Sequence, residues 1–130
     1  MLFINLPVKD LATSRRFFTA LGFAFNDQFA DEKMEAMIIG PDTFAMLLTE
    51  EYFATYTDKK IADTGEVTEA IFALGVESRQ RVDELAEAAA ANGGALSGET
   101  KDLGFAYTRA FTDPDGHLWE ATHMDFTAAQ

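Results

Sequence analysis

The stretch DPDGHLWEATHMD, residues 113–125, carries the strongest structural signal of this chain. Its Asp-Pro-Asp-Gly start favours a tight turn, because proline presets the backbone angle φ and glycine adopts positive φ without strain. The following residues, HLWEATHM, have the composition of a β-strand. The same stretch holds both histidines of the chain, its single tryptophan and Glu120. It therefore raises the question of whether these side chains form one wall of a metal site or are only neighbours on a hairpin.

The composition excludes several classes of protein. A chain of 130 residues suits one domain or two small halves that share a core. It contains no cysteine, which excludes disulfides, a thiol nucleophile and zinc-cysteine sites. The net charge of -12 repels a phosphate backbone, so we expect no nucleic acid partner. No apolar run approaches the roughly 20 residues that span a bilayer and no signal peptide is recognisable, so we expect no membrane partner and a cytoplasmic location.

The hydrophobic pattern predicts the same order of elements twice. In the first half we expect a strand at residues 3–8, a helix at 11–22 capped by Asp10, and strands at 23–30, 35–40 and 43–48. In the second half we expect a strand at 69–76, a helix at 79–94 capped by Ser78, and strands at 95–99, 105–112 and 117–124. Residues 50–66 are polar and irregular and predict a linker. An internal duplication is the economical explanation, and each sheet has one face without a helix.

Three segments in this order carry a resemblance to a known family. They are NLPVKDLATSRRFFTALGF at residues 5–23, IFALGVESRQRVDELAEAAAANGG at 71–94 and FTDPDGHLWE at 111–120. The chain resembles the vicinal oxygen chelate superfamily, which includes glyoxalase I, bleomycin-resistance proteins, fosfomycin-resistance proteins and extradiol dioxygenases. Within it, the sequence is most similar to small single-domain proteins loosely labelled predicted lactoylglutathione lyases.

The resemblance implies an α+β fold of two βαβββ modules that form an incomplete barrel around a cleft. A single domain would then span residues 1–130, with module one at about 1–49, a linker at about 50–66 and module two at about 67–126. Members of the superfamily commonly complete or extend the barrel by dimerisation, so we expect a homodimer.

The resemblance also implies where a divalent metal would be held, by one side chain from each of four strands. The matching positions are Phe3, Leu47, Ile71 and Glu120, with Met46 or Leu48 in place of Leu47 if the register slips. Three of the four are apolar and offer a hard cation no oxygen or nitrogen. We therefore expect no cofactor, or at most a divalent metal bound weakly at Glu120 with help from Asn5 or Glu69.

The two histidines are not expected to supply the missing metal ligands. Side chains alternate between the two faces of a strand, so His117, Trp119 and His123 are predicted to point away from the face of Glu120. We expect Trp119 in the core, His117 as a capping or surface residue, and His123 at a sheet edge or a dimer contact.

The strand FAYTRAFT, residues 105–112, allows two interpretations. If its large side chains face the cleft, Tyr107 and Arg109 line it, and Arg109 pairs with Glu120 or with an anionic ligand. If instead Phe105 and Phe111 belong to the core, Arg109 emerges at its rim. The alternation alone does not decide between them.

Two functions fit these residues, and a third, a purely structural or regulatory dimer module, would predict a cleft that is filled in. The first is binding of a small organic molecule in an apolar cleft without a metal; the residues expected to line that cleft are Phe3, Asn5, Leu47, Ile71, Tyr107, Arg109 and Glu120. The alternative is a metal-dependent lyase, isomerase or dioxygenase of the glyoxalase type, with Glu120 as metal ligand or proton-transfer base. The sequence does not decide whether the protein is an enzyme, and Glu120 is the one catalytic candidate.

Overall fold

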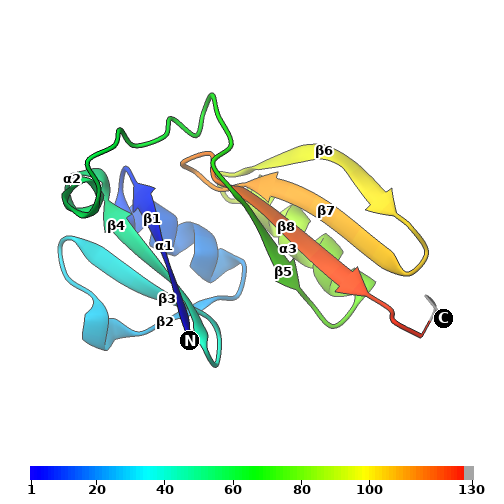
Figure 1. The fold of residues 1–130 in the computed structure, drawn as a ribbon. Helices are drawn as coiled ribbons and strands as arrows, with labels where there is room; N and C mark the ends of the chain where they lie inside the picture. Colours follow the sequence, from blue (N-terminus) through cyan, green and yellow to red (C-terminus); the bar gives the residue numbers. More distant parts are fainter. Residues whose placement is uncertain (128–130) are drawn as a thin grey trace. The chain divides into compact units, whose positions relative to one another are not determined.

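The computed structural model describes residues 1–127, which form two compact units (Figure 1). The first unit spans Met1–Asp63 and the second begins at Thr64. Each unit contains one four-stranded mixed sheet and one long helix. Within the part of the chain described, no helix has the length and apolar character needed to cross a bilayer.

The first unit is a βαβββ module followed by short helices. Its elements are β1 (Leu2–Val8), α1 (Leu11–Ala20), β2 (Ala24–Phe25), η1 (Asp27–Phe29), β3 (Met34–Gly40), β4 (Thr43–Thr49), α2 (Glu50–Phe53) and η2 (Ala54–Tyr56). The strands lie in the order β1-β4-β3-β2, with β1 parallel to β4 and the other pairs antiparallel. Helix α1 starts where the Asp10 side chain accepts a hydrogen bond from the Ala12 backbone N–H, as its capping sequence predicts.

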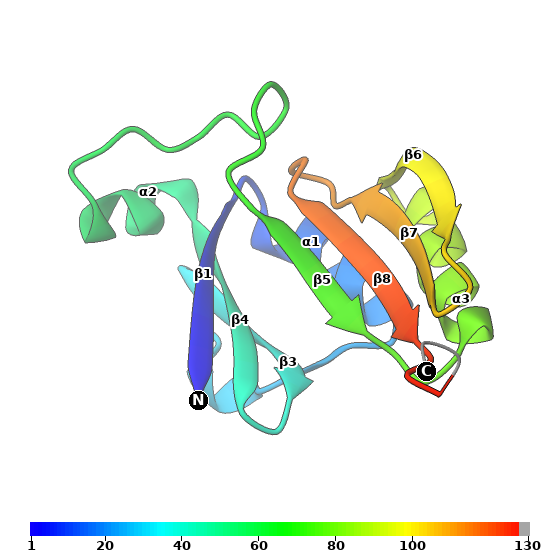
Figure 2. The ribbon, with the colours of Figure 1, turned by 45° about the vertical axis from the view of Figure 1, so that its right-hand side comes forward.

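The second unit repeats this topology. Its elements are β5 (Ile71–Gly75), α3 (Arg79–Ala91), β6 (Ala95–Asp102), β7 (Ala106–Thr112) and β8 (Leu118–Met124). The strand order β5-β8-β7-β6 is equivalent to that of the first unit, and β5 is likewise parallel to β8. Helix α3 lies across one face of this sheet and contacts β6, β7 and β8 (Figure 2). The predicted α+β fold of two βαβββ modules is thus confirmed.

The cores lie between each helix and its sheet. In the first unit, Phe17 and Phe18 of α1 and Leu47 of β4 have at most 1% of their surface exposed. In the second, Leu85 of α3 packs on the side of the sheet where Trp119 is fully buried. The prediction that Trp119 belongs to the core is therefore correct.

One predicted element is largely wrong. The run at residues 23–30 was expected to be a strand, but only Ala24–Phe25 pair with β3 before the chain turns into the 3-10 helix Asp27–Phe29. The cause is local, because the Asn26 side chain accepts a hydrogen bond from the Gln28 backbone N–H and caps the new turn. Of the linker predicted at residues 50–66, the first part forms the short helices α2 and η2. Residues 57–70 contain neither helix nor strand.

Candidate functional site

The first sheet presents an apolar face on the side away from α1. The register places Phe3 beside Phe44 and Asn5 beside Met46 across the parallel pair β1 and β4. Strand β3 adds Ala36 beside Met46 and Ile38 beside Phe44. We call this surface the first open face; it consists of Phe3, Asn5, Ala36, Ile38, Phe44 and Met46. No charged side chain belongs to this set.

A hollow of about 280 Å³ lies on the first open face. Its lining residues are Met1, Phe3, Asn26, Phe29, Ala36, Phe44 and Met46. The rings of Phe3 and Phe44 stack with their centroids 5.5 Å apart. The sole polar side chain in the wall belongs to Asn26, and its amide oxygen already accepts from Gln28. The hollow therefore suits an apolar guest.

The register also shows on which face of the first sheet the predicted cleft residues lie. Phe3 and Asn5 lie on the first open face as expected. Leu47 does not: it is fully buried, pairs with Leu6 and faces α1. Met46, the neighbour named for a shifted register, takes its place on the face of Phe3. The sequence could not separate the two because TFAMLL is apolar on both faces of the strand.

Phe29 and Asn26 were missed by the sequence reasoning, since they lie in the segment that was expected to be a strand. Phe44 was missed as well, although its spacing from Met46 would have revealed it. Residues two apart in a strand share a face, so a correct register for Met46 also places Phe44.

The second sheet presents a different surface on the side away from α3. Glu120 of β8 lies between Ala73 of β5 and Ala110 of β7, and Thr122 lies beside Thr108. We call this surface the second open face; it consists of Ile71, Ala73, Thr108, Ala110, Leu118, Glu120 and Thr122. The two threonine hydroxyls are hydrogen-bonded to each other at 2.8 Å. Ile71 and Glu120 therefore share a face, as the sequence predicts.

Tyr107 and Arg109 lie on the other face of β7, and the interpretation that places them beside Glu120 is corrected by the register. They pair with His123 and Ala121 and point toward α3. The Tyr107 hydroxyl donates to Asp83 Oδ1 at 2.7 Å, and Arg109 Nη1 donates to the same oxygen at 3.0 Å. These bonds, that of Tyr107 first, hold the pKa of Asp83 below its usual value. Both side chains thus tie α3 to β7.

The competing interpretation of this strand holds in part. Phe111 is fully buried, as expected of a core residue. Phe105 is 38% exposed and lies before β7 begins. Arg109 keeps a side-chain exposure of 17%, so it lies near the rim of the helix–sheet layer.

The turn at residues 113–116 is organised by a buried carboxylate. Asp113 is 4% exposed, and its Oδ1 accepts from the backbone N–H groups of Asp115 at 2.9 Å and His117 at 3.0 Å. Its Oδ2 accepts from Trp119 Nε1 at 3.1 Å. Burial raises the pKa of the Asp113 carboxyl despite these donors. Most of the polar crowding in this stretch therefore serves the turn itself.

Neither histidine joins Glu120. His117 was expected as a capping or surface residue; it is 1% exposed, so it does not lie at the surface, and its Nδ1 lies 3.0 Å from Glu69 Oε1. Glu69, a suggested extra metal donor, is thus engaged by His117. The Nδ1 atom of His123 lies 3.0 Å from the Val76 carbonyl oxygen, on the face of the sheet opposite Glu120. The alternation argument for His123 is confirmed.

The residues present do not fit a divalent metal. Of the positions that the resemblance assigns to ligands, Phe3, Met46 and Ile71 offer no hard donor and Glu120 offers one carboxylate. Within residues 1–127, no group of three or more histidine, aspartate and glutamate side chains is placed to hold an ion.

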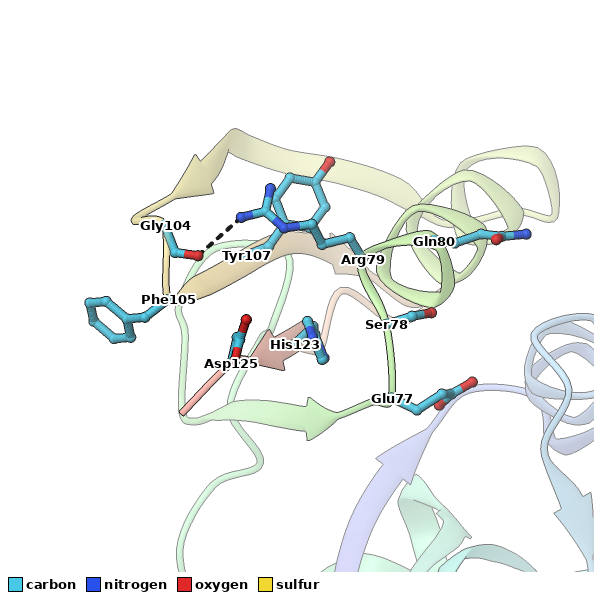
Figure 3. Close-up of a pocket in the computed structure, with 9 residues that line it drawn as sticks. All are labelled: Glu77, Ser78, Arg79, Gln80, Gly104, Phe105, Tyr107, His123 and Asp125. Carbon is cyan, nitrogen blue, oxygen red and sulfur yellow. Dashed lines mark hydrogen bonds between the residues drawn. The ribbon is translucent and has the colours of Figure 1, made fainter. Parts of the chain in front are cut away.

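A second hollow, of about 500 Å³, lies beside the start of α3 (Figure 3). Its lining residues are Glu77, Ser78, Arg79, Gln80, Gly104, Phe105, Tyr107, His123 and Asp125. The Arg79 guanidinium donates to both Asp102 oxygens, at 2.8 and 2.9 Å, and to the Gly104 carbonyl oxygen at 3.2 Å. This pairing lowers the pKa of Asp102 to about 2. The guanidinium is thus engaged within the protein, and the hollow has no evident role in binding.

Comparison with known proteins identifies the family of this chain. Residues 1–121 match the model of the Glyoxalase/Bleomycin resistance protein/Dioxygenase superfamily. The chain belongs to this superfamily. No curated protein matches the chain.

Solved structures share the fold of this chain. A hypothetical protein from S. aureus is 30% identical with a TM-score of 0.82, over 95% of this chain and 92% of that one. A glyoxalase-related enzyme from Fulvimarina pelagi is 21% identical with a TM-score of 0.80, over 95% and 86%. The fosfomycin resistance protein FosX from Listeria monocytogenes is 22% identical with a TM-score of 0.68, over 95% and 89%. The last two likenesses concern the fold alone.

Proposed function

We propose that the protein binds a small, mostly apolar organic molecule in the hollow of the first open face, without a divalent metal. One observation carries this proposal: Phe3 and Met46, at two positions that the resemblance assigns to metal ligands, both line the apolar hollow. The substitution that removes the metal donors also creates a surface on which an apolar molecule can pack.

The hollow sets limits on the ligand. At about 280 Å³ it is close to the lower end, roughly 300 Å³, of sites that hold drug-sized molecules. A body of one or two rings suits this size. Stacking on the Phe3 and Phe44 pair favours an aromatic ring, since offset aromatic contacts contribute about 1 kcal/mol beyond burial.

A neutral two-ring fluorescent probe such as Prodan tests this proposal. Phe3 is 55% exposed, so Phe3→Ala removes a wall of the hollow with little effect on the core. We expect about tenfold weaker probe binding, which corresponds to roughly 1.4 kcal/mol. Leu2→Ala is the matched control, because Leu2 is 56% exposed and neighbours Phe3 but points to the other face of β1. Equal effects of the two substitutions would contradict the proposal.

Metal analysis distinguishes the proposed function from the alternative, a metal-dependent enzyme that uses Glu120. We expect protein purified without chelator to carry less than one equivalent of nickel, zinc, manganese or iron. Stoichiometric metal that is lost in Glu120→Gln would establish the alternative instead.

A further inference from the structure

Glu120 differs from the other shielded carboxylates of the protein. Glu35 pairs with Arg15 at 2.8 Å, Asp83 pairs with Arg109 at 3.0 Å, and Asp113 accepts from Trp119. Glu120 is partly buried, yet within residues 1–127 it makes no hydrogen bond and no ion pair. A carboxylate taken partly out of water without a partner loses solvation that nothing in the protein replaces.

The side chains beside Glu120 on the second open face are small or apolar. Ala73 and Ala110 lie directly beside it on the flanking strands and carry one side-chain carbon each. Leu118 precedes it on the same face, and Ile71, paired with Leu118, is 54% exposed. The carboxylate thus stands in the middle of a sheet among small and apolar side chains, where an apolar body can pack beside it.

The charges on the second open face define which ligand group fits. Thr108 and Thr122 are neutral, and one of their two hydroxyls keeps its hydrogen for a further acceptor. The basic residue paired into this face is Lys101 of the edge strand β6, beside Thr108. It lies two strands from β8, about 10 Å at ordinary strand spacing, and forms no ion pair with Glu120. An anionic ligand would meet an uncompensated carboxylate on a chain of net charge -12.

A single carboxylate is too few donors for a divalent ion but suits an N–H donor. We propose that the second open face binds an organic ammonium group attached to an apolar body, with the ammonium on Glu120 and the body on Ile71 and Leu118. This site consists of residues of the second unit alone. Its test therefore does not depend on whether the hollow on the first open face binds a ligand.

Three probes with one body and different charges test this proposal. They are 1-naphthylmethylamine, 1-naphthylmethanol and 1-naphthoic acid, titrated by calorimetry and by backbone amide shifts in nuclear magnetic resonance spectra. We expect the amine to bind at least tenfold more tightly than the alcohol and the acid to bind most weakly. The amine should shift amides of Ile71, Leu118 and Thr122. Equal binding of amine and alcohol would overturn the proposal.

Substitution then assigns the charge to one residue. Glu120→Gln keeps the shape of the side chain, so the fold is expected to persist, and the amine should fall to the affinity of the alcohol while the alcohol is unchanged. Glu84→Gln, on an exposed position of α3, makes the same change in net charge and should leave amine binding intact. An equal loss in both variants would show a diffuse charge effect and would overturn the assignment to Glu120. Loss of Prodan binding in Phe3→Ala reports the other unit, so failure of one proposal is distinguishable from failure of the other.

Discussion

At the scale of single residues, the side chains of residues 113–125 have two different structural roles. Asp113, His117 and Trp119 hold one another within a buried turn. Glu120, the next residue along, points to the opposite face and has no such role. The polar residues that suggest a metal site in the sequence therefore lie on two different faces of the sheet and do not form one site.

Asp113→Asn tests the buried turn. An amide nitrogen would face Trp119 Nε1 or the turn amides, so we expect a loss of about 1–3 kcal/mol in the free energy of unfolding. Because burial raises the folded pKa of Asp113, its contribution is complete below its unfolded value and is lost as pH rises through the folded value. The cost of the substitution should therefore be largest below the usual aspartate pKa of about 3.9 and should shrink as the pH rises above it. Urea unfolding followed by Trp119 fluorescence measures the loss in unfolding free energy and its pH dependence. A loss that grows as the pH rises would contradict this role of Asp113.

Gly116→Ala tests the close approach of the linker to the same turn. Gly116 has φ of 90°, and an added Cβ would lie 2.7 Å from the Thr64 backbone oxygen. We expect a loss of about 2 kcal/mol or more in unfolding free energy, because strain and overlap add. Gly75→Ala in the same unit has open space around its Cβ and should change stability by less than about 0.5 kcal/mol. Similar thermal unfolding of the two variants would be inconsistent with this contact.

At the scale of elements, β7 shows what the alternation of a strand can and cannot reveal. The pattern of FAYTRAFT correctly separates two faces, but the sequence does not say which one meets the helix. Large side chains suit either a ligand surface or a helix interface. The partner that decides the matter, Asp83, lies on α3 and 26 residues before Arg109 along the chain. Long-range pairing of this kind is invisible to local pattern.

Arg109→Met tests the tie between α3 and β7. The side chain keeps its apolar stem but loses its bonds to Asp83, so we expect a cost of about 1 kcal/mol, as is usual for a partly exposed ion pair. Probe binding at Glu120 should not change, because Arg109 lies on the other face of the sheet. Tighter amine binding with unchanged stability would restore the interpretation that Arg109 lies beside Glu120 and neutralises it.

The helices and most strands follow from local rules in the sequence. Asp10 and Ser78 cap α1 and α3 as their positions predict, and period-two runs mark β1, β7 and β8. Prediction fails where a side chain competes with the backbone, as Asn26 does, and where both faces of a strand are apolar, as around Leu47. The ligand-facing residues of the first sheet depend on both features, which explains why Phe29 was missed and Met46 was named as an alternative to Leu47 alone.

At the scale of the whole molecule, the linker is the accessible part of the backbone. Residues 57–70 contain no helix or strand, and Lys59 and Lys60 within them are exposed. We expect brief trypsin treatment to cut first after Lys59 or Lys60 and to yield two fragments that mass spectrometry can assign, because proteases need an extended, solvated segment. A Lys59→Gln, Lys60→Gln double variant should resist this first cut. Initial cleavage at Arg15 or Arg81, inside the helices, would contradict the expectation.

The shared strand order of the two sheets bears on how the protein is made. In each unit the first strand pairs with the last, β1 with β4 and β5 with β8. During synthesis from the N-terminus, β1 finds its partner once Thr49 has emerged, whereas β5 must wait for Leu118–Met124, close to the end of the chain. Until then β5 and β7 carry unpaired edges, which are open to aggregation and to proteases. A chain that stops before Leu118 would thus contain a finished first unit joined to a second that lacks β8, one of its two central strands.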